Sequence, residues 1–288
     1  MSQDGKSDSD ILRELLHATR SAANLQLESL KMEVLRHWNE ELTKPRNANA
    51  KRLLRYGFKT FSQNDEDGII QEIFRRIGTK NRTFVEFGVS NGLECNTTKL
   101  LIEGWQGLWM EADHRSALDV LERFKPIMAS GRLKLVEAMV TPESIHTLLN
   151  AGSMTGEIDF LSIDIDGNDY WVWKAIESIT PRAVAIEYNS SLRPPSSLVV
   201  PYSPTRRWAG GNYFGASLEV LVRLGREKGY RIVGCNFAGV NAFFVRDDLC
   251  GDCFVEPATA EEHYEPPRYF ARMMPAGHPP QVGEFETV

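Results

Sequence analysis

The sequence predicts a doubly wound α/β domain with a mainly parallel, seven-stranded sheet that ends in an antiparallel hairpin, preceded by a long helix. Three observations predict this class. From about residue 60, short apolar runs alternate with amphipathic segments, a glycine-rich turn follows the first run, and the last two runs are only a few residues apart. With 288 residues, 42% of them hydrophobic, the chain has ample length for one large domain and an appendage.

The first element is a long helix. Residues 10–43 contain neither proline nor glycine, and apolar side chains recur in them at helical spacing. These are Leu12, Leu15, Leu16, Ala23, Leu27, Leu30, Val34 and Trp38. Such a helix buries its apolar positions either against another copy, giving a homo-oligomer, or along its own domain, and the sequence leaves both interpretations open. We expect an N-terminal helical segment and linker at 1–50, the α/β domain at 51–255 and a proline-rich tail at 256–288.

The apolar runs predict the strands of the sheet in chain order. Strands are expected at residues 83–88, 107–113, 133–140, 158–166, 183–189, 230–237 and 241–248. Helices are expected between the first five strands, at residues 96–105, 114–124, 142–152 and 169–179. Because only a few residues around Gly239 join the last two runs, they form a hairpin and one of them runs antiparallel to the sheet.

Charge and composition limit the classes of partner. Lysine and arginine total 33 against 39 acidic residues, a net charge of -6, so no global basic field attracts nucleic acid or anionic lipid. The polar, acidic N-terminus lacks an apolar leader, and no stretch reaches the roughly 18 apolar residues of a membrane span. We expect a cytoplasmic protein. Cys250 and Cys253 form a lone CxxC without a second pair, which favours reduced thiols over a zinc site.

The turn after the first strand carries a family resemblance. "VEFGVSNG" (85–92) resembles the first motif of class I S-adenosyl-L-methionine-dependent methyltransferases, an acidic residue followed by Gly-x-x-x-Gly, and the resemblance implies their Rossmann-like fold and that cofactor. Glu86 would face the cofactor's ammonium group, and Gly88 and Gly92 would remove side chains that block its approach. Glu111 ends the second strand roughly 20 residues after the first glycine, the spacing of a ribose-binding carboxylate. The expected cofactor-binding residues are Gln63, Glu86, Gly88, Asn91, Gly92, Glu111, Asp113, Ala138 and Asp164.

Two further segments resemble FkbM-type methyltransferases. "FSQNDEDGIIQEIF" (61–74) carries Ser-Gln-x-x-Glu-Asp, and "SIDIDGNDYWVWKAIESITPRAVAIEYN" (162–189) resembles the family's Asp-x-Glu-Gly-x-Glu followed by a proline and a strand that ends in glutamate. Asp166 replaces the family's glutamate, and an extra residue precedes Asp169. The resemblance covers residues 60–190 and implies O-methylation of a sugar, glycan, natural product or other polyhydroxylated metabolite.

Acidic side chains end the fourth and fifth strands. Strand alternation places Asp164 and Asp166 on one side, and Glu187 and Asn189 end the neighbouring strand. Carboxylates that converge repel one another unless protonated, hydrogen-bonded or bridged by a cation, so the four residues are a possible site for Mg²⁺ or another hard divalent cation. In the alternative, they accept hydrogen bonds from loop amides and substrate without a metal. Asp164 is the expected catalytic base, with Asp166 second.

The long loop at 190–217 is expected to form the acceptor pocket. Its prolines and glycines disfavour regular structure, while its aromatic and arginine side chains offer stacking faces and cationic forks for a sugar or phosphorylated acceptor. The expected substrate-binding residues are Asp169, Tyr202, Arg206, Arg207, Trp208 and Tyr213. Alternatively, the loop is a structural lid whose arginines pair with surplus acids.

Three functions remain open. The first is an S-adenosylmethionine-dependent O-methyltransferase. The second is an oxidoreductase that binds NAD or another nucleotide with the same turn, against which the final hairpin argues. The third is a non-catalytic, cofactor-binding scaffold protein that acts through its long helix.

Overall fold

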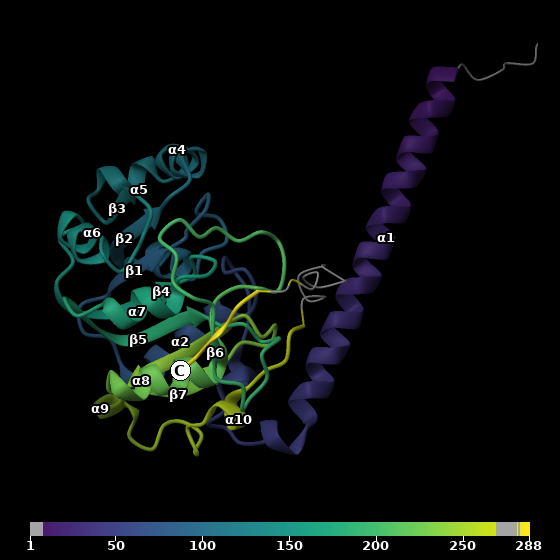
Figure 1. Cartoon of the computed structure of the whole chain (residues 1–288). Helices are drawn as coiled ribbons and strands as arrows, with labels where there is room; N and C mark the ends of the chain where they lie inside the picture. The colour runs from purple at the N-terminus through teal and green to yellow at the C-terminus, as the bar shows by residue number, and fades with distance from the viewer. Residues whose placement is uncertain (1–7, 269–280, 282) are drawn as a thin grey trace, which may run out of the picture. The chain divides into compact units, whose positions relative to one another are not determined.

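The computed structural model describes residues 8–268, 281 and 283–288, and the chain divides into two units, Met1–Lys44 and Pro45–Val288. In the first unit a single helix, α1 (Asp8–Thr43), runs over 36 residues and confirms the long N-terminal helix (Figure 1). Its exposed large apolar side chains are Leu12, Leu15, Leu16, Leu25, Met32 and Leu35. At 100° per residue these positions point in more than one direction around the helix, so no single face gathers them.

The second unit contains a seven-stranded sheet (Figure 1). Its strands are β1 (Thr83–Phe87), β2 (Gln106–Glu111), β3 (Leu133–Glu137), β4 (Gly156–Ile163), β5 (Ile179–Glu187), β7 (Tyr230–Cys235) and β8 (Asn241–Arg246). Their order is β3-β2-β1-β4-β5-β8-β7, in which β1 to β5 are parallel and β8 is antiparallel to both of its neighbours. This order confirms the class I methyltransferase fold and its terminal hairpin.

Helices cover both faces of the sheet (Figure 1). They are α2 (Glu66–Ile77), α3 (Thr98–Ile102), α4 (His114–Arg123), α5 (Lys125–Ala129), α6 (Ile145–Ala151), α7 (Asp169–Ala175), α8 (Leu218–Glu227), α9 (Asp247–Cys250) and α10 (Ala260–His263), with short 3-10 turns η1 (Pro45–Asn47) and η2 (Leu53–Tyr56). One apolar core packs α6, α7 and α8 against the sheet, and the other packs α2 and α3 against its opposite face. Among the described helices, none is long and apolar enough to cross a membrane.

The direction of chain progression changes between β1 and β4. From β1 the chain proceeds outward through β2 and β3, and from β4 it proceeds to the other side through β5. Loops that leave the carboxyl ends of β1 and β4 therefore diverge, and α/β sheets bind ligands in the crevice that such a divergence leaves. The fold places the predicted site residues at this edge.

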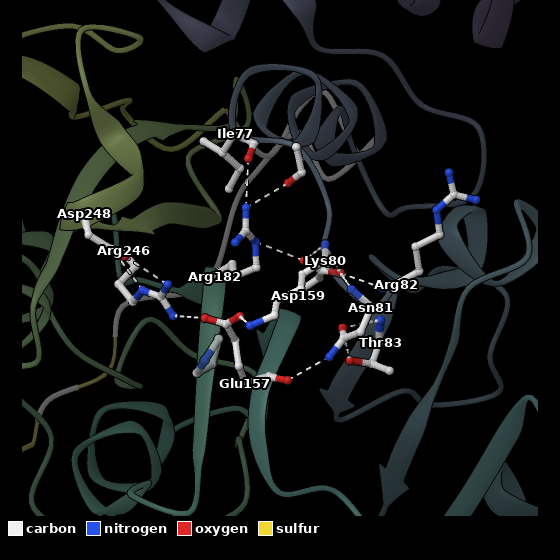
Figure 2. Close-up of polar contacts among 12 residues, drawn as sticks. Ile77, Lys80, Asn81, Arg82, Thr83, Glu157, Asp159, Arg182, Arg246 and Asp248 are labelled. Atoms are coloured by element: carbon white, nitrogen blue, oxygen red, sulfur yellow. Dashed lines mark hydrogen bonds and ion pairs between the residues drawn. The ribbon is translucent and has the colours of Figure 1, made fainter.

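A buried carboxylate holds the chain together at the other end of the strands, just before β1 begins (Figure 2). Asp159 on β4 is fully buried and accepts hydrogen bonds of 2.6 to 3.0 Å from the backbone amides of Lys80, Asn81 and Arg82. A guanidinium nitrogen of Arg182 on β5 lies 3.1 Å from the same carboxylate. We call this arrangement the Asp159 clamp. It holds the entry to β1 against β4 and β5, and so positions β1 for the site at its other end.

The loop at 190–217 contains regular structure that its sequence disfavours. A two-residue strand, β6 (Leu198–Val199), lies inside the loop expected to lack regular structure, and it pairs antiparallel with β9 (Glu286–Thr287). Residues 269–280 and 282 of the proline-rich tail lie outside the described residues. Since β9 hydrogen-bonds to β6, the end of the tail is fixed to the substrate loop.

Candidate functional site

A cavity of about 910 Å³ opens at the carboxyl edge of the sheet, where β1 and β4 diverge. Its lining includes all but one of the residues expected to bind the cofactor, namely Gln63, Glu86, Gly88, Asn91, Glu111, Asp113, Ala138 and Asp164. Asp166, Arg206, Arg207 and Trp208 line the same cavity. Cofactor and acceptor residues predicted from separate motifs therefore share one space.

The glycines of the first turn serve the protein's own packing. Gly88 has a φ of +73°, and a Cβ there would lie 1.7 Å from the backbone oxygen of Asp164. Gly92 has a φ of +79°, and its Cβ would meet the ring of Phe124 at 2.6 Å. The two glycines therefore admit the backbone of Asp164 and an aromatic ring. Gly88 also lines the cavity, where its expected role beside a cofactor stays a prediction, and Gly92 is the expected cofactor residue that does not line the cavity.

Glu86, the penultimate residue of β1, lines the cavity and contacts the loop that follows the strand. Its buried carboxylate accepts hydrogen bonds from the backbone amides of Asn96 at 2.8 Å and Thr97 at 3.0 Å, and from the Thr97 hydroxyl. Burial raises the pKa of Glu86 to about 7, and these hydrogen bonds oppose the rise. A cation bound in the cavity would favour the ionised carboxylate.

Glu111 ends β2 and braces the same turn from the other side. One carboxylate oxygen accepts from the backbone amide of Ser90 at 2.6 Å and the other from that of Asp113 at 2.7 Å. Each oxygen retains a lone pair for a hydroxyl in the cavity. Asp113 caps helix α4 by accepting from the Ser116 amide at 2.8 Å, and this bond, with a smaller contribution from the charge of Arg207, lowers the pKa of Asp113.

Three carboxylates meet where β4 and β5 end. Oxygen atoms of Asp164, Asp166 and Glu187 all lie within 4.8 Å of one another, and we call these residues the acidic cluster. Asp166 has a φ of +57°, an uncommon conformation for a residue with a side chain. This geometry brings together hard oxygen donors from two strands.

Two residues expected beside the acidic cluster have other partners. The Asn189 amide is buried, donates to the carbonyls of Asn212 at 2.8 Å and Phe214 at 3.0 Å, and accepts from the Ser191 amide, so it braces the substrate loop. We correct its expected role as a metal ligand on this ground. Its hydrogen-bonding groups face the protein, leaving Asp164, Asp166 and Glu187 as the donors.

Asp169 is also corrected, from substrate binding to loop support. It is buried, and its two carboxylate oxygens accept from the backbone amides of Ile165 and Gly167, each at 2.9 Å. Burial raises its pKa to about 6, and these bonds oppose the rise. Because it closes the turn that carries Asp166, its effect on the site is to position that carboxylate.

The aromatic residues of the substrate loop divide into two groups. Trp208 lines the cavity, whereas Tyr202 and Tyr213 do not. The Tyr202 hydroxyl donates to the Glu143 carboxylate, and the Tyr213 hydroxyl donates to the Glu284 carbonyl. The expectation that both tyrosines bind substrate is corrected, because their hydroxyls attach the loop to the domain.

Asn168 and Asn241 line the cavity and are absent from the sequence prediction. Both are almost completely buried, and the side-chain oxygen of each has no hydrogen-bond partner among the described residues. Asn168 lies inside the segment 162–189 that resembles FkbM-type methyltransferases, which was the available signal. Asn241 begins β8 and pairs with Glu187, and only the antiparallel register brings it to this edge. Enclosed oxygens without partners beside a cavity are candidates for contact with a ligand.

The Ser-Gln-x-x-Glu-Asp motif builds the wall that presents Gln63. One oxygen of Asp67 accepts from the backbone amides of Thr60, Phe61 and Ser62 at 2.6 to 2.9 Å. An oxygen of Glu66 accepts from the side-chain amide of Asn241. These buried acids hold the loop before α2, so their function is to fix the cavity wall.

No family model matches this sequence, and no curated protein matches it. Among solved structures, the chain is similar to a precorrin-6y C5,15-methyltransferase from Geobacter metallireducens, with 12% identity over 65% of this chain and 90% of that chain and a TM-score of 0.39. It is also similar to an O-methyltransferase from Bacillus cereus in complex with SAH, with 16% identity over 56% of this chain and 66% of that chain and a TM-score of 0.32. A third similar structure is the SAH-bound N-terminal domain of EvdMO1, with 13% identity over 74% of this chain and 94% of that chain and a TM-score of 0.41. At these TM-scores, the assignment of the fold rests on the strand order.

Proposed function

We propose that this protein is an S-adenosylmethionine-dependent O-methyltransferase, FkbM-like, that acts on a hydroxyl of a sugar, glycan or other polyhydroxylated metabolite. One observation carries the proposal: the carboxylate at the end of β2 and two carboxylates of the acidic cluster, those of Asp164 and Asp166, border a single cavity at the switch point of a class I methyltransferase sheet. Such a cavity can hold a cofactor and an acceptor side by side.

The chain's own residues fit a cationic cofactor with a ribose. Glu86 places a carboxylate in the cavity wall, and Glu111, fixed by two backbone amides, presents its remaining lone pairs where a diol can donate to both oxygens. Gln63, Asn91 and Ala138 complete the same wall. S-adenosylmethionine, when bound, supplies an electrophilic methyl group.

Asp164 is the proposed general base. It lines the cavity at the end of β4, and its backbone lies against Gly88, so its position is fixed relative to the cofactor wall. A carboxylate there can hold an acceptor hydroxyl and accept its proton. Asp166, held in an uncommon backbone conformation by the turn that Asp169 closes, is the second carboxylate.

The acidic cluster fits a hard divalent cation. Asp164, Asp166 and Glu187 offer oxygen donors within 4.8 Å of one another, the donor type and spacing that suit Mg²⁺. A bound cation would offset the repulsion among the carboxylates and orient vicinal hydroxyls of an acceptor.

Thermal unfolding with separate ligands tests the proposed function. S-adenosylhomocysteine at a hundred times its Kd should stabilise the native state by about 2.7 kcal/mol, which corresponds to a rise in melting temperature of roughly 5 to 10 °C. NAD⁺ at the same concentration should give no rise. A rise with NAD⁺ alone favours the oxidoreductase, and no rise with either ligand favours a scaffold role.

A further inference from the structure

We propose that the methyl acceptor carries an oxyanion, a carboxylate or a phosphate ester, that Arg206 binds. The inference rests on the proposed function and names the substrate class of the same site. It assigns Arg206 as a specificity-determining residue at the acceptor end of the cavity.

The Arg206 side chain is held in place at the cavity wall. One terminal nitrogen donates to the Pro201 carbonyl at 3.0 Å, and the guanidinium lies 5.6 Å from the centre of the Tyr213 ring. Its aliphatic part passes over Gly167, where a Cβ would lie 2.8 Å from Arg206 Cδ. These contacts place the guanidinium beside the turn that carries Asp166, so a ligand would not have to order it.

The charge of Arg206 has no ion-pairing partner in the described part of the chain. No described carboxylate oxygen lies within 4.0 Å of its nitrogens, whereas Arg231 and Arg246 each pair with two acids. Among the described residues, only the Pro201 carbonyl accepts a hydrogen bond from it. This contradicts the lid interpretation for this residue, in which the loop arginines neutralise surplus acids. A fixed guanidinium whose other terminal nitrogen has no acceptor within residues 8–268, 281 and 283–288 suits the planar geometry of a carboxylate or phosphate.

The distribution of charge in the cavity assigns different parts of an acceptor to different walls. Glu86 and Glu111 lie on the cofactor side, and Asp164 and Asp166 lie at the end of β4. Those four carboxylates suit a cationic cofactor, hydroxyl groups or a metal ion, and they would repel an oxyanion. Arg206 and Arg207 are the cationic side chains of this lining, and Arg206 is the one that the Pro201 carbonyl and the Tyr213 ring hold in place. A sugar acid or sugar phosphate can therefore place its oxyanion at Arg206 and its hydroxyl at Asp164.

The end of the chain supports this arrangement through Tyr213. The Tyr213 hydroxyl donates to the Glu284 carbonyl, and its ring packs edge-on against Phe285 with centroids 5.0 Å apart. β9 then pairs with β6 in the same loop. These contacts hold the ring that stacks on Arg206, which gives Tyr213 a positioning role in place of the direct contact expected from the sequence.

Calorimetric titration of the full chain, saturated with S-adenosylhomocysteine, tests the proposal at constant ionic strength. The probes are D-glucuronate and D-glucose 6-phosphate, with D-glucose as their neutral match. At least one anionic probe should bind about tenfold more tightly than D-glucose, the scale of one charge-assisted hydrogen bond. Whichever anion binds more tightly identifies the group as carboxylate or phosphate.

Matched variants locate the effect. Arg206→Gln should remove the tenfold preference, and Arg206→Lys should restore part of it because a lysine keeps the charge but loses the fork. Arg193→Gln removes the same charge from an exposed position in the same loop and should change nothing. All three variants should bind S-adenosylhomocysteine as tightly as the wild type.

The outcomes separate this inference from the proposed function. If the wild type does not bind S-adenosylhomocysteine, the proposed function fails. If S-adenosylhomocysteine binds normally, three results would each show that the oxyanion proposal is wrong while the proposed function stands. They are that D-glucose binds as tightly as both anions, that neither anion binds, or that Arg206→Gln retains the preference for the anion.

Discussion

Replacing Glu111 with alanine should weaken the binding of S-adenosylhomocysteine. The substitution removes the carboxylate that faces the cavity from β2 and that two backbone amides, at 2.6 and 2.7 Å, hold in position. Hydrogen bonds to a charged group are each worth about 1.5 to 3 kcal/mol. A loss of that size in binding corresponds to a roughly 10- to 150-fold rise in Kd.

The same substitution also removes support for the glycine turn, and the assay must separate the two effects. The amides of Ser90 and Asp113 lose their acceptor, so the melting temperature of Glu111→Ala should fall even without ligand. Calorimetry is therefore performed at a temperature where circular dichroism shows the variant folded. Tryptophan fluorescence, to which the buried Trp109 on the same strand contributes, reports whether the packing around β2 changes.

Glu137→Ala is the matched control for Glu111→Ala. Glu137 ends β3 directly opposite Glu111 in the parallel register, but it is exposed, pairs with His114 and does not line the cavity. It removes the same charge one strand away and should leave the affinity unchanged. A folded Glu111→Ala protein that binds S-adenosylhomocysteine like the wild type would remove Glu111 from the site and refute the reasoning from the strand end.

Four further changes have defined outcomes. If the acidic cluster needs a cation, EDTA should stop methyl transfer and Mg²⁺ should restore it. If Asp164 acts alone, EDTA should have no effect, and Asp164→Asn should cut turnover by roughly 10² to 10⁴ while the affinity for the cofactor is kept. Full activity in both experiments would contradict the placement of the chemistry at the end of β4. Deleting residues 1–44 should lower the number of copies per particle, which is the mass measured by light scattering divided by the mass of one chain. An unchanged number of copies would leave only intramolecular packing for α1. Asp159→Asn should lower the free energy of unfolding, measured by urea denaturation, by about 3 kcal/mol, because Arg182 and three backbone amides lose the buried charge that they contact. A difference below about 0.5 kcal/mol would show that the Asp159 clamp is dispensable. Burial raises the pKa of Glu86 from 4.5 to about 7, so its contribution to stability is fully present below pH 4.5 and is lost as pH rises through about 7. The free energy of unfolding should therefore fall less between these pH values in Glu86→Gln than in the wild type. An identical pH profile for the two proteins would contradict the shift.

The fold followed from local sequence patterns because its strands are short, apolar and separated by helices. Glu111 and Asp164 could be placed at one edge of the sheet for the same reason: parallel strands joined by helices bring their carboxyl ends together. Neither inference needed to know which strands are neighbours.

The errors concern side chains whose contacts come from distant parts of the chain. Nothing near Tyr213 in the sequence indicates that residue 284 accepts its hydrogen bond, and nothing near Asn189 indicates that the carbonyls of residues 212 and 214 occupy its amide. Asn241 was missed because it begins an antiparallel strand, whose amino end lies at the edge where parallel strands end. Such contacts depend on tertiary register, which residue type and spacing do not determine.

A crystal structure of the complex with S-adenosylhomocysteine tests the central claim most directly. The account predicts density in the cavity between β1, β2 and β4, with the ribose hydroxyls within hydrogen-bond distance of the Glu111 carboxylate and the sulfur on the side of Asp164. Density for the ligand at any other place, or in this cavity with the ribose away from Glu111, would contradict it.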